Sequence, residues 1–224
     1  MTKRNRTMAL RINDVAPDFT AESSEGTINF HDWIGDNYAI LFSQPKDFTP
    51  VCTTEFGAVA QLAGEFAKRG AKPIGVSVDS VEEHMKWKSD IEGFAGTAVT
   101  FPILDDTSLS IAKLYDMLPA EAYLPDGRTP ADSATVRTVF IIGPDKKIRL
   151  MIIYPMSVGR NFDEILRALD AIQLTDKEEV ATPADWRKGE DVIVSMALDD
   201  DAAKAKFGEI DVKLPYLRTT KMPS

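Results

Sequence analysis

Cys52 is the single cysteine among 224 residues, and it lies in the stretch DFTPVCTTEF, residues 47–56. A chain with one thiol cannot close an internal disulfide, so this cysteine is either a small buried apolar side chain or a reactive one. Thr49 is a favourable N-cap residue, and Pro50 suits the first position of a helix. A helix that begins there would place Cys52 in its first turn.

The first turn of a helix favours a negatively charged side chain. Its backbone N–H groups have no partners within the helix, and the helix dipole places positive charge at that end. The thiolate is such an anion, and it is the form of cysteine that acts as a nucleophile. The position of Cys52 therefore indicates a nucleophilic or redox-active thiol.

The elements around Cys52 indicate a sheet with parallel strands. The apolar runs YAILFSQ (38–44) and PIGVSVD (73–79) are typical of buried strands, and residues 50–69 between them have the apolar spacing of a helix. This order predicts a right-handed crossover between parallel strands. The first strand then delivers Cys52 to the carboxyl edge of the sheet, where α/β proteins bind ligands.

The rest of the main body predicts further elements of the same sheet. Ser80 is followed three residues later by Glu83, which is the spacing of a capping box at the start of a helix over residues 80–91. Periodicity and turn residues predict strands at 27–30 and 101–106, helices at 108–118 and 161–174, the latter capped by Asn161, and a β-hairpin around residues 143–147.

The composition changes after residue 174, where the chain becomes charged and is interrupted by Pro183. We expect residues 1–9 to form a flexible N-terminus, residues 10–174 the main domain and residues 175–224 a small C-terminal domain. The main domain is expected to be α/β, a mixed sheet flanked by helices with a thioredoxin-like architecture, and the C-terminal domain a small α+β extension.

Charge and residue content argue against several classes of function. The formal net charge of -9 disfavours nucleic-acid binding, and the apolar runs are too short to span a membrane. One cysteine with two distant histidines gives no spacing for a metal site, and no haem or flavin motif is present.

The basic start of the chain has no apolar segment behind it, so we expect no signal peptide. A single thiol fits a reducing compartment, and we expect the cytoplasm.

Pro45, Thr49 and Cys52 match the P-x-x-x-T-x-x-C motif of peroxiredoxins, and DFTPVCTTE is similar to the one-cysteine, peroxiredoxin-six class of the AhpC/TSA superfamily. The resemblance covers nearly all of residues 10–220. It is carried by segments in the same order along the chain, namely DVAPDF, FHDWIGD, SVDSVEEHMKW, FPILDD, GPDKKIRL, YPMSVGRNFDEILR and VATPADW.

The resemblance implies a thiol peroxidase that reduces hydrogen peroxide and organic hydroperoxides. Cys52 would attack one peroxide oxygen, expel water or an alcohol, and become a sulfenic acid. Thr49 would hydrogen-bond the peroxide, and Pro45 would shield the thiolate from water. Arg137 matches the active-site arginine of the family, which stabilises the thiolate and the charge on the peroxide oxygens.

Three further residues are expected in supporting roles. Arg160 matches a second arginine near the site of the family, and Glu55 is placed to bridge Arg137 and Arg160, although a solvated carboxylate stays open. Gln44 stands where many members carry a histidine directly before the motif proline. Glutamine can hydrogen-bond there but cannot titrate near neutrality.

The absence of a second cysteine predicts an external reductant, because no resolving thiol exists within the chain. Glutathione, another small reductant or a partner thiol protein would restore Cys52, and pairing of Cys52 with its copy in another chain stays open. We expect no cofactor, since no motif for one is present. The resemblance implies a homodimer joined through the region after residue 175. A higher ring of dimers is an alternative.

Two other functions stay open from the sequence. A cysteine-based redox sensor or holdase chaperone would use the same thiol without catalytic turnover. A Cys-His hydrolase would need one of the two histidines beside Cys52. We expect instead that His31 makes a structural hydrogen bond and that His84 lies on the surface of a helix.

Overall fold

The structure is a computed structural model that describes residues 9–120 and 134–223, in two compact units comprising residues 1–160 and 161–224. Residues 1–8 of the expected flexible N-terminus lie outside the described residues. The division into units falls before the helix at residues 161–174. The domain boundary expected after that helix, between residues 174 and 175, stays a prediction.

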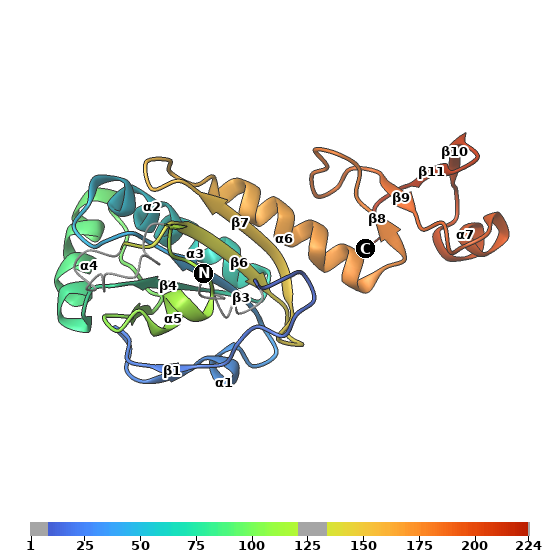
Figure 1. The fold of residues 1–224 in the computed structure, drawn as a ribbon. Coiled ribbons are helices and arrows are strands. Elements are labelled where there is room, and N and C mark those ends of the chain that lie inside the picture. The colour runs from blue at the N-terminus through green and yellow to red at the C-terminus, as the bar shows by residue number, and fades with distance from the viewer. Residues whose placement is uncertain (1–8, 121–133, 224) are drawn as a thin grey trace. The chain divides into compact units, whose positions relative to one another are not determined.

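A five-stranded mixed sheet forms the centre of the first unit, with the strand order β5-β4-β3-β6-β7 (Figure 1). Strands β3, β4 and β5 are parallel, and β6 is antiparallel to both β3 and β7. The expected mixed sheet and the expected hairpin are therefore confirmed. The strands are β3 (Tyr38–Ser43), β4 (Ala71–Ser77), β5 (Ile103–Asp105), β6 (Arg137–Ile142) and β7 (Ile148–Tyr154).

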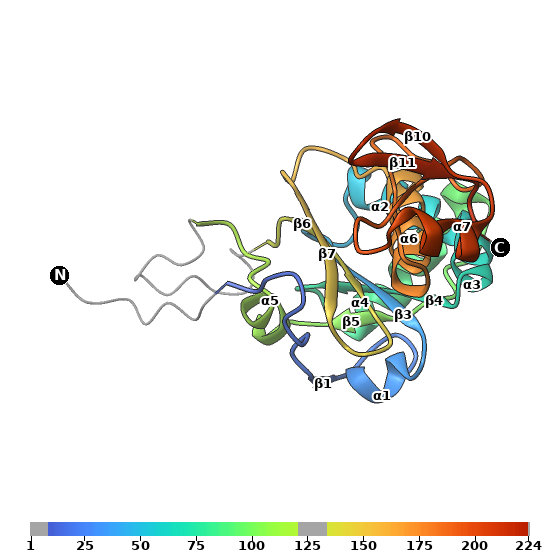
Figure 2. The same ribbon diagram turned by 90° about the vertical axis from the view of Figure 1, so that its right-hand side faces the viewer.

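Helices cover both faces of this sheet (Figures 1 and 2). Helices α1 (Phe30–Ile34) and α5 (Ser110–Leu114) pack on the face that carries Ala39 and Leu41 of β3. Alternate residues of a strand point to opposite faces, so Phe42 lies on the other face, where its ring is 5.0 Å from that of Phe56. Burial of these apolar side chains on both faces is what holds the sheet in place.

The expected helix over residues 50–69 is present as two segments, α2 (Pro50–Gln61) and α3 (Ala63–Lys68). The irregularity at Leu62 is small, because Leu62 still donates its backbone N–H to Ala58 and accepts from Phe66. Gly70 follows α3 with φ of 57°, the left-handed conformation in which glycine commonly ends a helix.

Helix α4 (Val81–Ala95) packs against α2 on this second face. Its capping box of Ser80 and Glu83 is confirmed, and the helix continues four residues beyond the expected end. The two helices approach closely at Gly57, where an added Cβ would lie 2.9 Å from the Cβ of Ala95. Packing against α4 therefore helps to position α2 and the residues that α2 carries.

Two short strands, β1 (Thr20–Ala21) and β2 (Ile28–Asn29), pair with each other before α1. The expected strand at residues 27–30 is thus shorter than predicted. Asn29 accepts a hydrogen bond from the backbone of Asp32 and caps α1, so the helix begins at Phe30. None of the helices in the described part of the chain is long and apolar enough to cross a membrane.

The second unit begins with α6 (Phe162–Lys177), capped by Asn161 as expected. A small sheet of order β10-β11-β9-β8 follows, with a core around Val180, Trp186 and Val192. Its elements are β8 (Val180–Ala181), β9 (Val192–Val194), α7 (Asp200–Phe207), β10 (Asp211–Leu214) and β11 (Leu217–Thr220). The expected small α+β extension is confirmed as an element pattern.

Candidate active site

Cys52 lies in the first turn of α2, as the sequence predicts. Thr49 is the N-cap residue with extended backbone angles, but its side chain makes no capping hydrogen bond. Its hydroxyl instead donates to the carbonyl oxygen of Lys46 at 2.9 Å. The first-turn N–H groups of α2 therefore have no side-chain cap from Thr49 and remain suited to a nearby anion.

The sulfur of Cys52 is in contact with a guanidinium group. Cys52 is fully buried, and Nη1 of Arg137 donates to its Sγ at 3.4 Å. Arg137 is the first residue of β6, and its Nε donates to the carbonyl oxygen of Met156 at 2.7 Å. The strand and this second hydrogen bond hold the guanidinium beside the sulfur.

Glu55 lies between the two arginines expected at the site. Its Oε2 is 2.6 Å from Nη1 of Arg137 and 2.7 Å from Nη2 of Arg160. Its Oε1 accepts from the backbone N–H of Arg160 at 2.8 Å and from Nε of the same residue at 2.9 Å. Such charge-assisted, bidentate contacts are geometrically demanding, so the carboxylate fixes the orientation of both guanidinium groups.

Arg160 also connects Glu55 to the sheet. Its Nη1 donates to the carbonyl oxygens of Ser43 at 2.7 Å and Thr138 at 3.1 Å, and its guanidinium carbon lies 5.2 Å from the centre of the Phe42 ring. Burial lowers the pKa of Arg160, and the hydrogen bonds and charge of Glu55 oppose this shift. Glu55 therefore offsets part of the cost of burying this guanidinium.

The charges of this buried cluster do not balance. Arg137, Arg160 and Glu55 are at most 7% exposed, and together they carry two positive charges and one negative charge. A buried charge without a partner is costly. The cluster in contact with the Cys52 sulfur therefore has one positive charge in excess.

The loop between β3 and α2 holds the other expected residues. Pro45 is buried and Thr49 is half-buried at the start of α2. Gln44 is fully buried, and its Nε2 donates to Oδ1 of Asp47 at 2.5 Å, while its backbone carbonyl accepts from the hydroxyl of Thr135. Gln44 therefore contributes to the structure of the loop.

The expectation that His84 lies on a helix surface is wrong, because its side chain is fully buried. Its Nδ1 is 2.6 Å from Oδ2 of Asp47. The i, i+3, i+7 spacing with Trp87 and Ile91 carries the signal that could have found it, since these three residues share the buried face of α4. The expected structural hydrogen bond of His31 is present, 2.8 Å to the carbonyl oxygen of Ala16. Both histidines are engaged away from Cys52, which disfavours the hydrolase.

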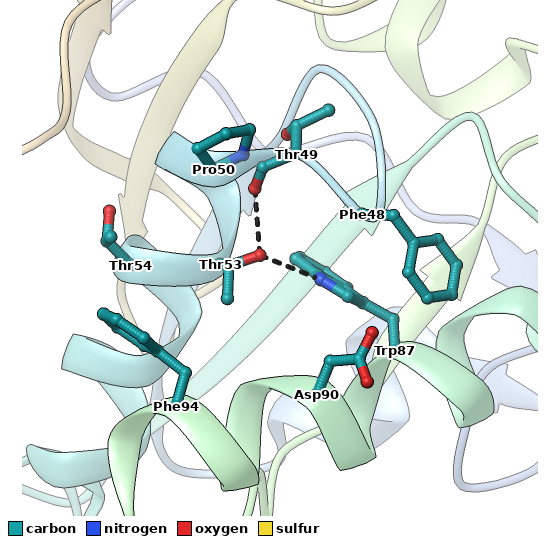
Figure 3. Close-up of a pocket in the computed structure, with 8 residues that line it drawn as sticks. All are labelled: Phe48, Thr49, Pro50, Thr53, Thr54, Trp87, Asp90 and Phe94. Carbon is teal, nitrogen blue, oxygen red and sulfur yellow. Dashed lines mark hydrogen bonds between the residues drawn. The ribbon is translucent and has the colours of Figure 1, made fainter.

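A cavity of about 410 Å³ lies beside the start of α2, between this helix and α4. It lies on the face of α2 that carries Pro50, Thr53 and Thr54, whereas helical spacing places Cys52 on the opposite face. In Figure 3, Nε1 of Trp87 reaches the hydroxyl of Thr53, which in turn reaches the carbonyl oxygen of Thr49. The lining residues are Phe48, Thr49, Pro50, Thr53, Thr54, Trp87, Asp90 and Phe94.

Comparison with known proteins identifies the family of the chain. The profile of the AhpC/TSA family matches residues 12–151, and that of the C-terminal domain of 1-Cys peroxiredoxin matches residues 171–209. The mitochondrial peroxiredoxin PRX1 of Saccharomyces cerevisiae is 52% identical over 215 residues, covering 95% of this chain and 81% of that protein. Peroxiredoxin-6 of Mus musculus is 50% identical over 225 residues, covering 96% and 98%.

Solved structures show the same relationship. A cysteine-to-serine mutant of peroxiredoxin 6 from Arenicola marina superposes with a TM-score of 0.89 at 43% identity, covering 96% of this chain and 100% of that chain. A yeast mitochondrial 1-Cys peroxiredoxin gives a TM-score of 0.85 at 50% identity, covering 95% and 99%.

The protein has a thioredoxin-like fold in which the buried cysteine contacts an arginine. Together with its relatives, this places it among the antioxidant thiol-dependent peroxidases. The chain belongs to the AhpC/TSA family, among its one-cysteine peroxiredoxins. Since it has a single cysteine, it depends on an external reductant to complete its catalytic cycle.

Proposed function

We propose that Cys52 is the residue that reduces hydrogen peroxide and organic hydroperoxides. The observation that carries this proposal is the 3.4 Å contact between the Cys52 sulfur and Arg137, within a buried cluster that otherwise has an excess positive charge. The thiolate attacks one peroxide oxygen, an S–O bond forms and the O–O bond breaks. The departing oxygen takes a proton and leaves as water or an alcohol, and Cys52 becomes a sulfenic acid.

The neighbouring residues have distinct proposed roles. Arg137 stabilises the thiolate and then the negative charge that develops on the peroxide oxygens. The hydroxyl proton of Thr49 is used in its bond to Lys46, which leaves the hydroxyl oxygen to accept a hydrogen bond from the peroxide O–H. Pro45 excludes water from the sulfur. Glu55 orients Arg137.

Arg160 and Gln44 act further from the peroxide. Arg160 holds Glu55 through three hydrogen bonds and ties it to the end of β3. Gln44 fixes the loop that carries Pro45 and Thr49 through its bond to Asp47. Both residues are proposed to maintain the site rather than to touch the substrate.

Recycling of Cys52 requires a thiol from outside the chain. We propose that the sulfenic acid condenses with glutathione or a thioredoxin-type protein thiol, giving a mixed disulfide and water, and that a second thiol then releases Cys52. The yeast structure similar to this chain concerns a thiol resolving mechanism via glutathione and thioredoxin systems. That similarity supports both classes of reductant for this chain.

Assembly and location are part of the same proposal. A homodimer through residues 175–224 is supported by the match to the 1-Cys peroxiredoxin C-terminal domain and by apolar side chains exposed around β10, namely Val212, Leu214 and Tyr216. A ring of dimers is the larger alternative, and sedimentation at several concentrations distinguishes the two. We place the protein in a reducing compartment, the cytoplasm; the yeast relative is named as mitochondrial.

Steady-state turnover tests the proposed activity. The protein is supplied with hydrogen peroxide and with either glutathione and its reductase or thioredoxin and its reductase, and NADPH consumption is followed. We expect sustained consumption with at least one system and none with C52S. A single stoichiometric oxidation without turnover in either system would contradict a peroxidase and favour the redox sensor.

A further inference from the structure

The buried pair of His84 and Asp47 lies behind the loop that precedes Cys52. Nδ1 of His84 is 2.6 Å from Oδ2 of Asp47, and its Nε2 is 3.1 Å from the carbonyl oxygen of Leu104. Both partners are acceptors, whereas a neutral imidazole has a single N–H. The two contacts are satisfied together only when the pair holds one proton on Nε2 and a second between Nδ1 and Oδ2.

Asp47 is in turn the centre of a buried hydrogen-bond network. Its Oδ1 accepts from Gln44 at 2.5 Å and from the hydroxyl of Ser77 at 3.1 Å, and its backbone N–H donates to Oδ2 of Asp79 at 2.7 Å. Gln44, Asp47, Ser77, Asp79 and His84 are all at most 6% exposed. The network therefore fixes Asp47 from α4 and from the end of β4.

Helix α4 holds the same loop at a second point. Trp87 lies one turn after His84, and its Nε1 donates to the hydroxyl of Thr53 at 3.1 Å. That hydroxyl donates to the carbonyl oxygen of Thr49 at 2.9 Å, as Figure 3 shows. One face of α4 is thus connected to the loop at Asp47 and at Thr49.

Phe48, between these two anchors, has an unfavourable backbone conformation. Its φ is 54°, a value that bulky residues rarely adopt, and its side chain is 51% exposed. A half-exposed ring supplies little packing to compensate for that strain. The hydrogen-bonded residues Asp47 and Thr49 lie on either side of this strained position.

The charged groups near the pair are mostly carboxylates. Asp79 follows β4, Glu83 on α4 accepts from the backbone of Ser80, and Asp105 on β5 accepts from the backbone of Val81. Lys46, on the loop itself, is exposed. His84 is thus the residue of α4 whose ring reaches Asp47, and Asp79 reaches the backbone of Asp47 from just beyond β4.

We infer that His84, acting through Asp47, is a positioning residue that holds residues 44–49 in the shape that places Pro45 and Thr49 beside Cys52. The inference rests on the proposed role of Cys52 as the residue oxidised by peroxide. It assigns His84 no contact with the substrate. Its loss should therefore affect reaction with peroxide more than the general reactivity of the thiol.

Two substitutions of similar size test the hydrogen bonds of the two ring nitrogens of His84 separately. H84N keeps an amide donor near the place of Nδ1 and thus the bond to Asp47, whereas H84Q keeps a donor near the place of Nε2 and loses that bond. H31Q, at the other histidine, is the matched control. For each variant, the rate of Cys52 oxidation by hydrogen peroxide and the rate of its alkylation by iodoacetamide are measured on folded protein.

We expect H84Q to slow oxidation by about tenfold to a hundredfold, the scale of a misplaced reacting group, while alkylation changes less than about twofold. H84N should lie within about threefold of wild type, because the hydrogen bond to Asp47 is retained. H31Q should match wild type in both rates. If H84Q does not fold, D47A and D47N provide the same comparison from the loop, with D47A slow and D47N close to wild type.

Three results would overturn the inference. H84Q could oxidise at the wild-type rate, its two rates could fall in parallel, or H84N could be as slow as H84Q. A wild-type Cys52 that peroxide does not oxidise is a separate outcome, because it contradicts the proposed function itself. If wild type is oxidised and H84Q equals it, only the role of His84 is contradicted.

Discussion

A single nitrogen of Arg137 contacts both the sulfur of Cys52, at 3.4 Å, and the carboxylate of Glu55, at 2.6 Å. The same guanidinium group therefore contacts the sulfur and is itself oriented by a buried carboxylate. We predict that R137M slows peroxide oxidation of Cys52 by about 10²–10³-fold, the usual cost of removing one such donor. Rapid-mixing kinetics at a fixed pH measures this rate. R137K restores the charge without the forked geometry, and it should fall between wild type and R137M.

Removal of Glu55 should destabilise the fold as well as the site. E55A leaves two buried guanidinium groups without their shared anion, and we expect it to lower the free energy of unfolding by about 3–5 kcal/mol. E55Q keeps one acceptor oxygen of similar shape and should lose less. Urea unfolding followed by circular dichroism measures both values. Equal stability of E55A and wild type would show that the cluster does not need its carboxylate.

Gly75 allows α2 to approach the sheet. An added Cβ at this residue of β4 would lie 2.6 Å from the ring of Phe56, one turn after Cys52. We predict that G75A lowers the free energy of unfolding by about 1–3 kcal/mol through overpacking, and that it slows Cys52 oxidation by displacing α2.

Gly64 provides the matched control for this substitution. An added Cβ there meets no atom within 4 Å, and the residue lies inside helix α3. G64A should therefore stabilise the protein by about 0.5–1 kcal/mol. Similar effects of G75A and G64A would contradict the packing argument.

Asp79 makes the stability of the protein depend on pH. Burial raises the pKa of this carboxyl group, and the negative charge of Asp47 raises it further. The hydrogen bond from the Asp47 backbone opposes this rise. A raised pKa means that the folded state binds the proton more tightly than the unfolded state. The resulting stability is present below the unfolded pKa and is lost as the pH rises through the folded pKa.

The neutral variant D79N tests the direction of this pH dependence of stability. It keeps an acceptor for the backbone of Asp47 and does not titrate, so it should be more stable than wild type near neutral pH. The difference should shrink as the pH falls and Asp79 of wild type becomes protonated. Urea unfolding of both proteins across the acid range gives the comparison. A difference that is constant with pH would contradict the assignment.

The sequence predicted the position of Cys52 in the first turn of a helix, but not the contacts that surround it. Cys52 at the start of a helix follows from Thr49 and Pro50, because N-cap and N1 preferences are local. The bond between Arg137 and Cys52 joins residues 85 positions apart in the chain, and only the family resemblance indicated it. The spacing of His84 with Trp87 and Ile91 indicates its burial, but its partner Asp47 lies 37 positions away and no local pattern indicates that pairing.

The irregularity at Leu62 and the positive φ of Phe48 could not be predicted from the local sequence either. Leucine and phenylalanine are not typical of a helix interruption or of a positive φ. Phe48 lies between Asp47 and Thr49, whose backbones are hydrogen-bonded to Asp79 and Thr53. Contacts of this kind between separate segments are not visible in local sequence preferences.

Intact mass spectrometry tests the central claim most directly. The folded, reduced protein is treated with one equivalent of hydrogen peroxide in the presence of a sulfenic-acid trap. We predict a single adduct on wild type, mapped to Cys52, and none on C52S. A folded wild-type protein whose Cys52 remains unmodified under these conditions would contradict the account.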